Sequence, residues 1–341
     1  MQVSKTVTAW AGAAAVISLA LAGTAKADAL SELATAAAKG PEVLWYESSK
    51  ESQIDKVIAA FNNKYPNVKV KHIRVVGGNK MAGRVVQEVQ GRGYTADLVS
   101  SGAAQTWALN DRNYLLKTDW SKLGVPKRVT PTDFAVAIAA SVYVILVNTK
   151  KVPAEEQPKS WDDLTKKKWM GRIGGWVRAG AHTQMSKVWG QDKAEAELRK
   201  FVALKPFLFK STFPMAQQVA AGEVDVAIGF FHTAQPPISA GAPLKRIALD
   251  PAPMHTIYTA VTKSARNKAG ATLFLSWLVT STGAKAYEDA TNRGSHLLEG
   301  TRTHALVKEA KTAEYPAEET GTYRKVAKKF NKILSSAGAA R

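Results

Sequence analysis

The sequence predicts an α/β protein with two mostly parallel sheets that carry helices on their faces. Two observations support this fold class. From residue 42 onward, short apolar strands alternate with amphipathic helices, which is the pattern of repeated βα units. The chain of 341 residues is also long enough for two domains of ordinary size, and it contains no internal repeat or heptad array.

The N-terminal segment predicts export. Lys5 is followed by an apolar stretch from Val7 to Ala22, and Ala25-Lys26-Ala27 is a small-x-small cleavage pattern. We therefore expect residues 1–27 to be a signal peptide that is cleaved near Ala27, with the mature protein in the periplasm. The alternative is an uncleaved membrane anchor, although the stretch is near the lower length limit for a span.

The chain is strongly basic and has no cysteine. Its formal net charge is +19, and loss of Lys5 and Lys26 with the signal peptide leaves +17. Such an excess suits nucleic acid, an anionic membrane surface or an anionic ligand, or it reflects ordinary solvated lysines. Export and the even spread of charge argue against nucleic acid. The absence of cysteine excludes thiol nucleophiles, zinc–thiolate sites and disulfides.

The first half of the mature chain begins with an Ala-rich segment, residues 28–40, that we expect to be frayed. Ser48 and Glu51 form a capping-box pair that opens a helix ending near Tyr65. The remaining predicted elements here are strands at 43–46, 68–76, 96–99 and 142–147, and a helix at 81–90.

The second half continues the alternation. Gly222 predicts the end of one helix, because glycine is favoured just after a helix. The predicted elements are a helix opening at 161–164, a strand at 172–175, a helix at 215–221, strands at 224–228 and 257–261, a helix at 268–279, and a basic helical region from 308.

Several turns that follow strands offer hydroxyls, small residues and cations. A helix that starts after a strand presents free backbone N–H groups and a positive dipole end, which suits a small polar or anionic ligand. Ordinary helix capping is the plain alternative for each serine, His232 has the alternative of a structural histidine, and Phe230-Phe231 that of core residues. The candidate ligand-binding residues are Ser48, Ser49, Ser101, Gly102, Arg178, Ala179, Gly180, Ala181, His182, Thr212, His232 and Thr233.

Enzyme signatures are missing from the sequence. There is no HExxH, GxSxG or GxxxxGK[ST] motif, and the glycine pair Gly175 and Gly180 is followed by Ala181-His182 in place of Lys-Ser/Thr. The six histidines show no metal-ligand spacing, and no acid–base pair stands out among the carboxylates. We expect no catalysis, no cofactor and no bound metal.

Five segments resemble the extracellular solute-binding proteins of ABC importers, in particular the ferric-iron-type branch of this two-lobed family. The third segment is the most specific, through its Asn-Thr-Lys, Pro-Lys-Ser-Trp and Lys-Trp-x-Gly-Arg-Ile elements. In chain order the segments are VLWYESSKESQIDKVIAAFNNKYPNVKV, TADLVSSGAAQTWAL, VILVNTKKVPAEEQPKSWDDLTKKKWMGRIG, QQVAAGEVDVAIGF and AVTKSARNKAGATLFLSWLVTSTGAKAY.

This resemblance implies a type II periplasmic-binding-protein fold, with two lobes joined by crossing hinge strands. The first lobe would comprise residues 42–140 plus 256–303, and the second lobe residues 141–255 plus 304–341. The chain would cross between them near 142–147 and 257–261.

The resemblance does not extend to the iron ligands of the branch. Iron-binding members use a His in the first turn, a carboxylate in the second and a tyrosine pair later, where this chain has Ser48-Ser49, Ser101-Gly102, and Phe230-Phe231 or His232-Thr233. Ferric iron prefers anionic oxygen ligands, which these positions lack. The anion-holding loop of the branch is similar to Arg178–Ala181 with Thr212.

We therefore expect a monomeric receptor that captures a small anionic organic solute between its lobes and delivers it to an ABC permease. A phosphate ester or phosphonate is favoured as the ligand, and a carboxylate would use the same donors. The alternatives are a ferric-iron transport protein with a non-standard site, a secreted phosphate-ester enzyme, and a binding protein that serves a chemoreceptor.

Overall fold

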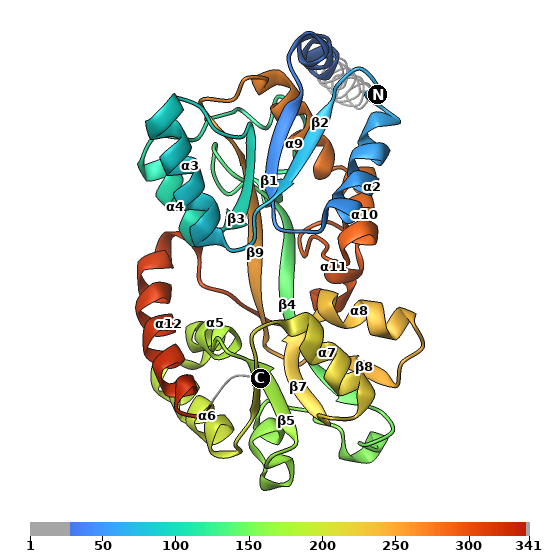
Figure 1. Cartoon of the computed structure of the whole chain (residues 1–341), viewed down its shortest axis with the longest axis vertical. Helices are drawn as coiled ribbons and strands as arrows, with labels where there is room; N and C mark the ends of the chain where they lie inside the picture. Colours follow the sequence, from blue (N-terminus) through green and yellow to red (C-terminus); the bar gives the residue numbers. More distant parts are fainter. Residues whose placement is uncertain (1–27, 339–341) are drawn as a thin grey trace, which may run out of the picture.

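The computed structural model describes residues 28–338 as two α/β bodies stacked end to end, with one ten-stranded sheet running through both (Figure 1). The strand order is β2-β1-β3-β9-β4-β7-β5-β6, while β8 pairs with β4 and β10 with β9. The predicted signal peptide lies outside the described residues. Among the residues that are described, no helix is both long and apolar enough to cross a bilayer. The predicted α/β class is confirmed.

The first body contains three parallel strands and the helices that cover them. Strand β1 lies between β2 and β3, and β3 pairs antiparallel with β9. Apolar side chains from β1, α2 and α9 meet in its core. The elements of this body are β1 (Val43–Glu47), α2 (Glu51–Asn62), β2 (Val70–Arg74), α3 (Gly78–Arg92), β3 (Leu98–Gly102), α4 (Ala103–Asp111), η1 (Lys127–Val129), α9 (Lys268–Leu278) and α10 (Ser281–Thr291).

The second body repeats this plan. Strand β5 lies between β6 and β7, all three parallel, and β7 pairs antiparallel with the second half of β4. Its elements are η2 (Ala154–Glu156), η3 (Asp162–Thr165), η4 (Lys167–Trp169), β5 (Ile173–Trp176), α5 (Gly180–Trp189), α6 (Gln191–Ala203), β6 (Phe207–Phe209), α7 (Thr212–Ala221), β7 (Val226–Phe230), α8 (Phe231–Ser239) and β8 (Leu244–Ile247).

Two long strands, β4 (Val136–Asn148) and β9 (Ala252–Val261), cross between the bodies (Figure 1). Residues 136–142 of β4 pair with β9, and residues 143–148 pair with β7 and β8. All thirteen residues of β4 are buried. A strand that is covered on both faces has no solvent-facing side, which explains why all of its residues except Ser141, Tyr143 and Asn148 are purely apolar.

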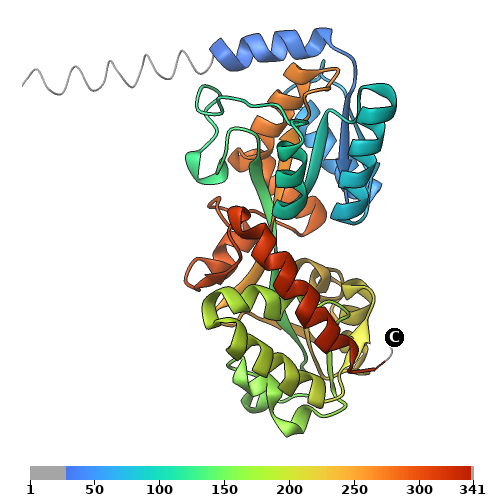
Figure 2. The same ribbon diagram turned by 90° about the vertical axis from the view of Figure 1, so that its left-hand side faces the viewer.

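The C-terminal segment returns to the waist and then packs along the second body (Figure 2). The basic region predicted from 308 is helical mainly in α12, whose Val326, Phe330 and Leu334 lie in the second core. The guanidinium of Arg324 donates to Ala104 O in α4 of the first body at 2.6 Å, so α12 touches both bodies. The elements are α11 (Arg302–Val307), β10 (Thr312–Ala313), η5 (Ala317–Glu319) and α12 (Thr320–Ser335).

The predicted frayed start is wrong, because residues 28–39 form a helix. Its Ala37 is buried in the first core, and Leu30 and Leu33 pack against that core. The apolar contacts on one side stabilise the helix despite its polar remaining surface. Residues 161–164 are also not the start of an α-helix, since a short 3₁₀ turn, η3, occupies this place.

The predicted capping box at Ser48 and Glu51 is wrong as well. Helix α2 begins at Glu51 with Lys50 as its N-cap, and Lys50 N–H donates to Gln53 Oε1 at 3.1 Å. The hydroxyl of Ser48 instead donates to Glu47 Oε1 at 3.2 Å. The Ser48 turn is therefore tied to the end of β1 and not to the helix.

The lobe boundaries inferred from the resemblance, 42–140 plus 256–303 and 141–255 plus 304–341, remain a proposal. Two of the three boundaries fall within β4 and β9, and the one at 303/304 falls in α11. Near residue 142 the hydrogen-bond partners of β4 change from β9 to β7 and β8.

Replacing Phe274 with Ala tests the first core. The ring is fully buried, with its centroid 5.3 Å from Trp45 and 4.9 Å from Phe61. We expect the free energy of unfolding in urea to fall by about 3–5 kcal/mol, because a cavity replaces the ring. Met170→Ala, at a side chain that is 50% exposed, is the control and should change it by less than about 0.5 kcal/mol. Equal losses in both variants would contradict this packing.

Candidate functional site

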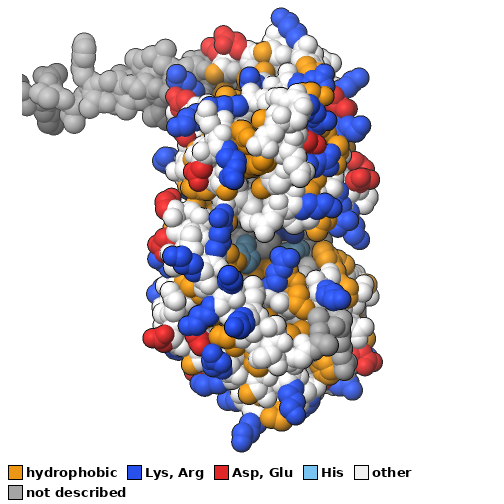
Figure 3. Space-filling view, turned by 60° about the vertical axis from the view of Figure 1, so that its left-hand side comes forward, with side chains coloured by type: hydrophobic (Ala, Val, Ile, Leu, Met, Phe, Trp, Pro, Cys, Tyr) orange, Lys and Arg blue, Asp and Glu red, His pale blue; other side chains and the backbone are white. Residues whose placement is uncertain are grey.

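The carboxyl ends of two strands of the first body and three strands of the second body meet at the waist between the bodies. Strands β1 and β3 of the first body lead into α2 and α4, and β5, β6 and β7 of the second body lead into α5, α7 and α8 (Figure 1). Each helix therefore starts near the waist with N–H groups that have no partner inside the helix. Figure 3 shows the hollow at this waist, with histidine side chains inside it and Lys and Arg side chains around it.

A contact between two side chains crosses the waist. Arg293, in the loop after α10, places Nη2 3.2 Å from Nε2 of His232 in α8. A guanidinium can only donate, so His232 Nε2 is the acceptor and the imidazole proton is assigned to Nδ1. Burial, with the neighbouring Arg293 charge, holds the pKa of His232 well below its ordinary value, and the ring is neutral.

This pair leaves buried donors unused. His232 Nδ1 and Arg293 Nε and Nη1 are buried and have no hydrogen-bond partner. The ion pair between Arg293 Nη1 and Glu47 Oε1, at 3.7 Å, is too long for a hydrogen bond. Buried donors without partners are rare, since each loses its hydration without compensation. A ligand acceptor at the waist would satisfy them.

The first turn is organised around the carboxylate of Glu47 at the end of β1. Ser49 N–H, Ser48 Oγ–H and Tyr287 Oη–H all donate to this carboxylate. Glu47 is only 1% exposed, so these donors hold it in place. The hydroxyl of Ser48 and the backbone N–H of Ser49 are thus used to hold a buried carboxylate that lies beside Arg293.

A separate chain of hydrogen bonds ends at the hydroxyl of Tyr143 on β4. Tyr315 N–H donates to Gln184 Oε1, which assigns Gln184 Nε2 as the donor to His255 Nδ1 at 2.8 Å. His255 therefore carries its proton on Nε2 and donates it to Tyr143 Oη at 3.0 Å. The Tyr143 hydroxyl proton is then free to be donated elsewhere, and burial raises its pKa so that it stays bound.

The predicted loop Arg178–Ala181 lies beside this hydroxyl. A Cβ on Gly180 would overlap Tyr143 Oη, so glycine is required for the start of α5 to come this close. Ala179 N–H donates to Asn331 Oδ1 of α12 at 2.8 Å, which fixes the loop. Arg178 is exposed, with its guanidinium 4.9 Å from the Trp176 ring centre.

Other predicted residues lie in the fold in less open positions. His182 is buried with its ring 5.7 Å from Phe201, and burial lowers its pKa to about 4, so its ring belongs to the second core. Thr233 Oγ1 donates to Phe230 O at 3.0 Å, so its hydroxyl proton is used within the first turn of α8. Ser101 Oγ shares a hydrogen bond with Thr106 Oγ1 at the start of α4, which Gly102 caps, and Thr212 opens α7.

Sequence patterns did not single out Glu47, Arg293, Tyr143 or Asn331. Glu47 carried a signal, because it is a carboxylate at the end of an apolar strand immediately before the predicted turn. Arg293 and Asn331 carried none, since their partners are 61 and 152 residues away in the chain.

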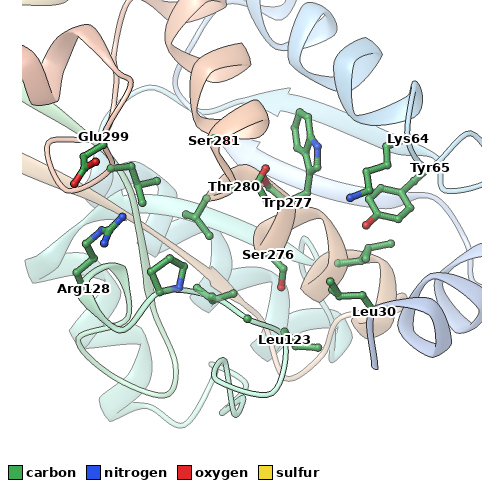
Figure 4. Close-up of a pocket in the computed structure, with 16 residues that line it drawn as sticks. Leu30, Lys64, Tyr65, Leu123, Arg128, Ser276, Trp277, Thr280, Ser281 and Glu299 are labelled. Carbon is green, nitrogen blue, oxygen red and sulfur yellow. The ribbon is translucent and has the colours of Figure 1, made fainter. Parts of the chain in front are cut away.

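A separate cavity of about 350 Å³ lies wholly within the first body (Figure 4). Leu30, Tyr65, Leu123 and Trp277 line its apolar part, and Arg128 and Glu299 lie at its edge. None of the candidate ligand residues borders it. Among residues 28–338, no group of three or more His, Asp or Glu side chains is placed to hold a metal ion.

The model of a bacterial extracellular solute-binding protein family matches residues 43–290, well over half of the chain. The chain belongs to this family. It is a solute-binding protein, and its family consists of binding proteins rather than enzymes. No curated protein sequence matches the chain.

This chain aligns with solved structures of the same fold over almost the entire length of those structures. Iron-bound HitA from Pseudomonas aeruginosa is similar with a TM-score of 0.72 and 18% identity, over 86% of this chain and 99% of that one. AfuA from Actinobacillus pleuropneumoniae, solved with fructose-6-phosphate, has a TM-score of 0.67 and 21% identity, over 86% and 98%. The predicted resemblance to the family and its two-lobed fold are confirmed.

In this solute-binding protein Glu314 ties the segment after β10 to the crossing strand β9. Thr256 donates to its carboxyl through N–H at 2.5 Å and Oγ–H at 2.6 Å. Burial nevertheless raises the pKa of Glu314 to about 7 from its ordinary 4.5. Between these pH values the folded protein keeps a proton that the unfolded chain has lost.

We expect Glu314 to make the protein less stable as pH rises from about 4.5 to 7, because in this range only the folded state binds the proton and folding must take it up from solution. Glu314→Gln is neutral at every pH and should remove this part of the slope. Urea unfolding of both proteins at pH 5, 6, 7 and 8 measures it. Buried histidines titrate in both proteins and cancel in the difference, so a constant difference across this range would refute the prediction.

Proposed function

We propose that this protein is the periplasmic solute-binding component of an ABC importer and captures a small anionic organic solute between its two bodies. The observation that carries the proposal is the set of unpartnered donors on Arg293 and His232, which come from different bodies and meet at the waist. An anionic oxygen is the natural partner for such donors, because charge-assisted hydrogen bonds are the strongest available.

Further groups that favour an anion lie on the second body. The free Tyr143 hydroxyl, the exposed Arg178 and the start of α5 at Gly180 lie on the second body. A guanidinium and a helix N-terminus both favour negative charge. The nearest buried carboxylate, Glu47, is already held by three donors and by the charge of Arg293. The site is therefore suited to an acidic head group.

A phosphate ester or phosphonate is the favoured ligand class, and a carboxylate would use the same donors. A similar structure, AfuA, was solved with fructose-6-phosphate, which supports a phosphate-bearing ligand on this fold. The structure of iron-bound HitA has a somewhat higher TM-score, but ferric iron requires several anionic oxygen ligands, and of the two turns only the first holds a carboxylate, Glu47, which three protein donors already engage.

The crossing strands β4 and β9 allow the bodies to move as hinged units. Donors from both bodies are satisfied together only when the waist is closed, so the ligand favours the closed form. The Arg324 contact of α12 with Ala104 also spans the bodies and would form or break with this motion. A permease would then recognise the closed arrangement.

Isothermal titration with phosphate esters, phosphonates, dicarboxylates and ferric citrate tests the proposal. We expect at least one organic anion to bind, and Arg293→Ala to weaken its binding by roughly 10- to 100-fold through the loss of charged hydrogen bonds. Arg293→Lys keeps the charge but not the geometry and should recover part of the affinity. Lys193→Ala, at an exposed lysine of α6, is the control. Binding of ferric citrate alone would overturn the proposal.

Tyr143→Phe gives an independent test of the chain of hydrogen bonds that ends at Tyr143. The substitution removes only the hydroxyl, so the protein should remain folded while affinity for the same anion falls about 5- to 20-fold, as expected for one lost hydrogen bond to a charged group. Unchanged affinity would show that the Tyr143 proton does not reach the ligand.

A further inference from the structure

The second body presents an aromatic wall beside the unpartnered donors of Arg293 and His232. Phe213, in the first turn of α7, is 43% exposed. Its ring centroid lies 6.1 Å from that of His232, the residue that contacts Arg293 across the waist. The other large hydrophobic side chains that are exposed within residues 28–338 are Val76, Tyr94 and Met170, and none of them has a ring contact with a residue of the site.

The rings behind Phe213 form one continuous set. Phe230 stacks on His232 with centroids 5.3 Å apart and planes inclined by 26°. It also packs against Tyr143 at 4.2 Å and Trp176 at 5.7 Å. Trp176 in turn lies under the guanidinium of Arg178. The aromatic wall, defined as Phe213, His232, Phe230, Tyr143 and Trp176, therefore extends from the crossing strand β4 to an exposed cation.

An exposed phenyl ring at this position leaves an apolar face in water next to polar donors. Isolated exposed apolar side chains are common, but this one adjoins the site and continues a stacked set of rings. Aromatic rings favour offset-stacked or edge-to-face contact with another ring. A sugar or a short aliphatic chain has no aromatic ring with which Phe213 could make such a contact.

We propose that the solute is an aromatic acid, with a planar ring that packs on Phe213 and an anionic head group at Arg293, His232 and Tyr143. This inference rests on the anion site of the proposed function and adds the chemistry of the ligand body. Phe213 is the residue that determines the specificity for this body, because its ring is the most exposed of the wall.

Matched pairs of ligands separate ring planarity from size and charge. Phenylphosphonate is compared with cyclohexylphosphonate, and benzoate with cyclohexanecarboxylate, by isothermal titration against the wild-type protein. We expect at least one aromatic ligand to bind at least fivefold more tightly than its saturated partner. In Phe213→Ala the ratio should fall below twofold, while Phe213→Leu, which keeps an apolar side chain, should also lose most of the preference.

Met170→Ala is the matched control, since it removes an equally exposed apolar side chain that has no part in the wall, and it should keep the wild-type ratio. Binding of both members of each pair with equal affinity, or a preference unchanged in Phe213→Ala, would overturn the aromatic ligand and leave the anion site standing. If neither these acids nor the phosphate esters and dicarboxylates bind, the anion site and the inference drawn from it both fail.

Discussion

Strand β4 supplies hydrogen-bond partners to both halves of the ten-stranded sheet. Its first half pairs with β9, its second half pairs with β7 and β8, and every one of its residues is buried. Buried backbone groups, which water cannot reach, must find hydrogen-bond partners inside the protein. The position of β4 therefore determines where the two halves of the sheet end. The strand ends that approach the waist, and with them the turns that carry polar groups, depend on this one shared ladder.

The waist contains some polar groups that already have hydrogen-bond partners in the protein and others that do not. Glu47 and Gln184 have partners on every side, and their role is to set the direction of Arg293 and Tyr143. Arg293 and His232 retain free donors. A rigid, satisfied layer behind a layer of free donors is the arrangement that positions binding groups accurately, because the supporting hydrogen bonds are made before a ligand arrives.

The fold followed from the sequence where the signals were local. The helix predicted at 268–279 was correct to within one residue, and the apolar run at 142–147 was correctly predicted as a strand, although β4 already starts at Val136. Burial on both faces and helical periodicity are visible in one stretch of chain. The turns at Ser48 and Arg178 were found because they follow strands. Arg293 and Tyr143 could not be found in this way, because their roles depend on partners brought near by the crossing strands. The polar type of His182 suggested a ligand contact, and the structure places its ring beside Phe201, a position that its polar type alone does not indicate.

Helix α12 limits how far this chain can be shortened from its C-terminus. It covers the second core with Phe330, holds the loop at Ala179 through Asn331, and reaches the opposite body through Arg324. A protein cut before Thr320 would expose the apolar surface of the second core and would lose the contacts of α12 with the Ala179 loop and with α4. The crossing strands and the sheet would remain. The final helix is thus a structural part of the site, and trimming it for expression would change recognition as well as solubility.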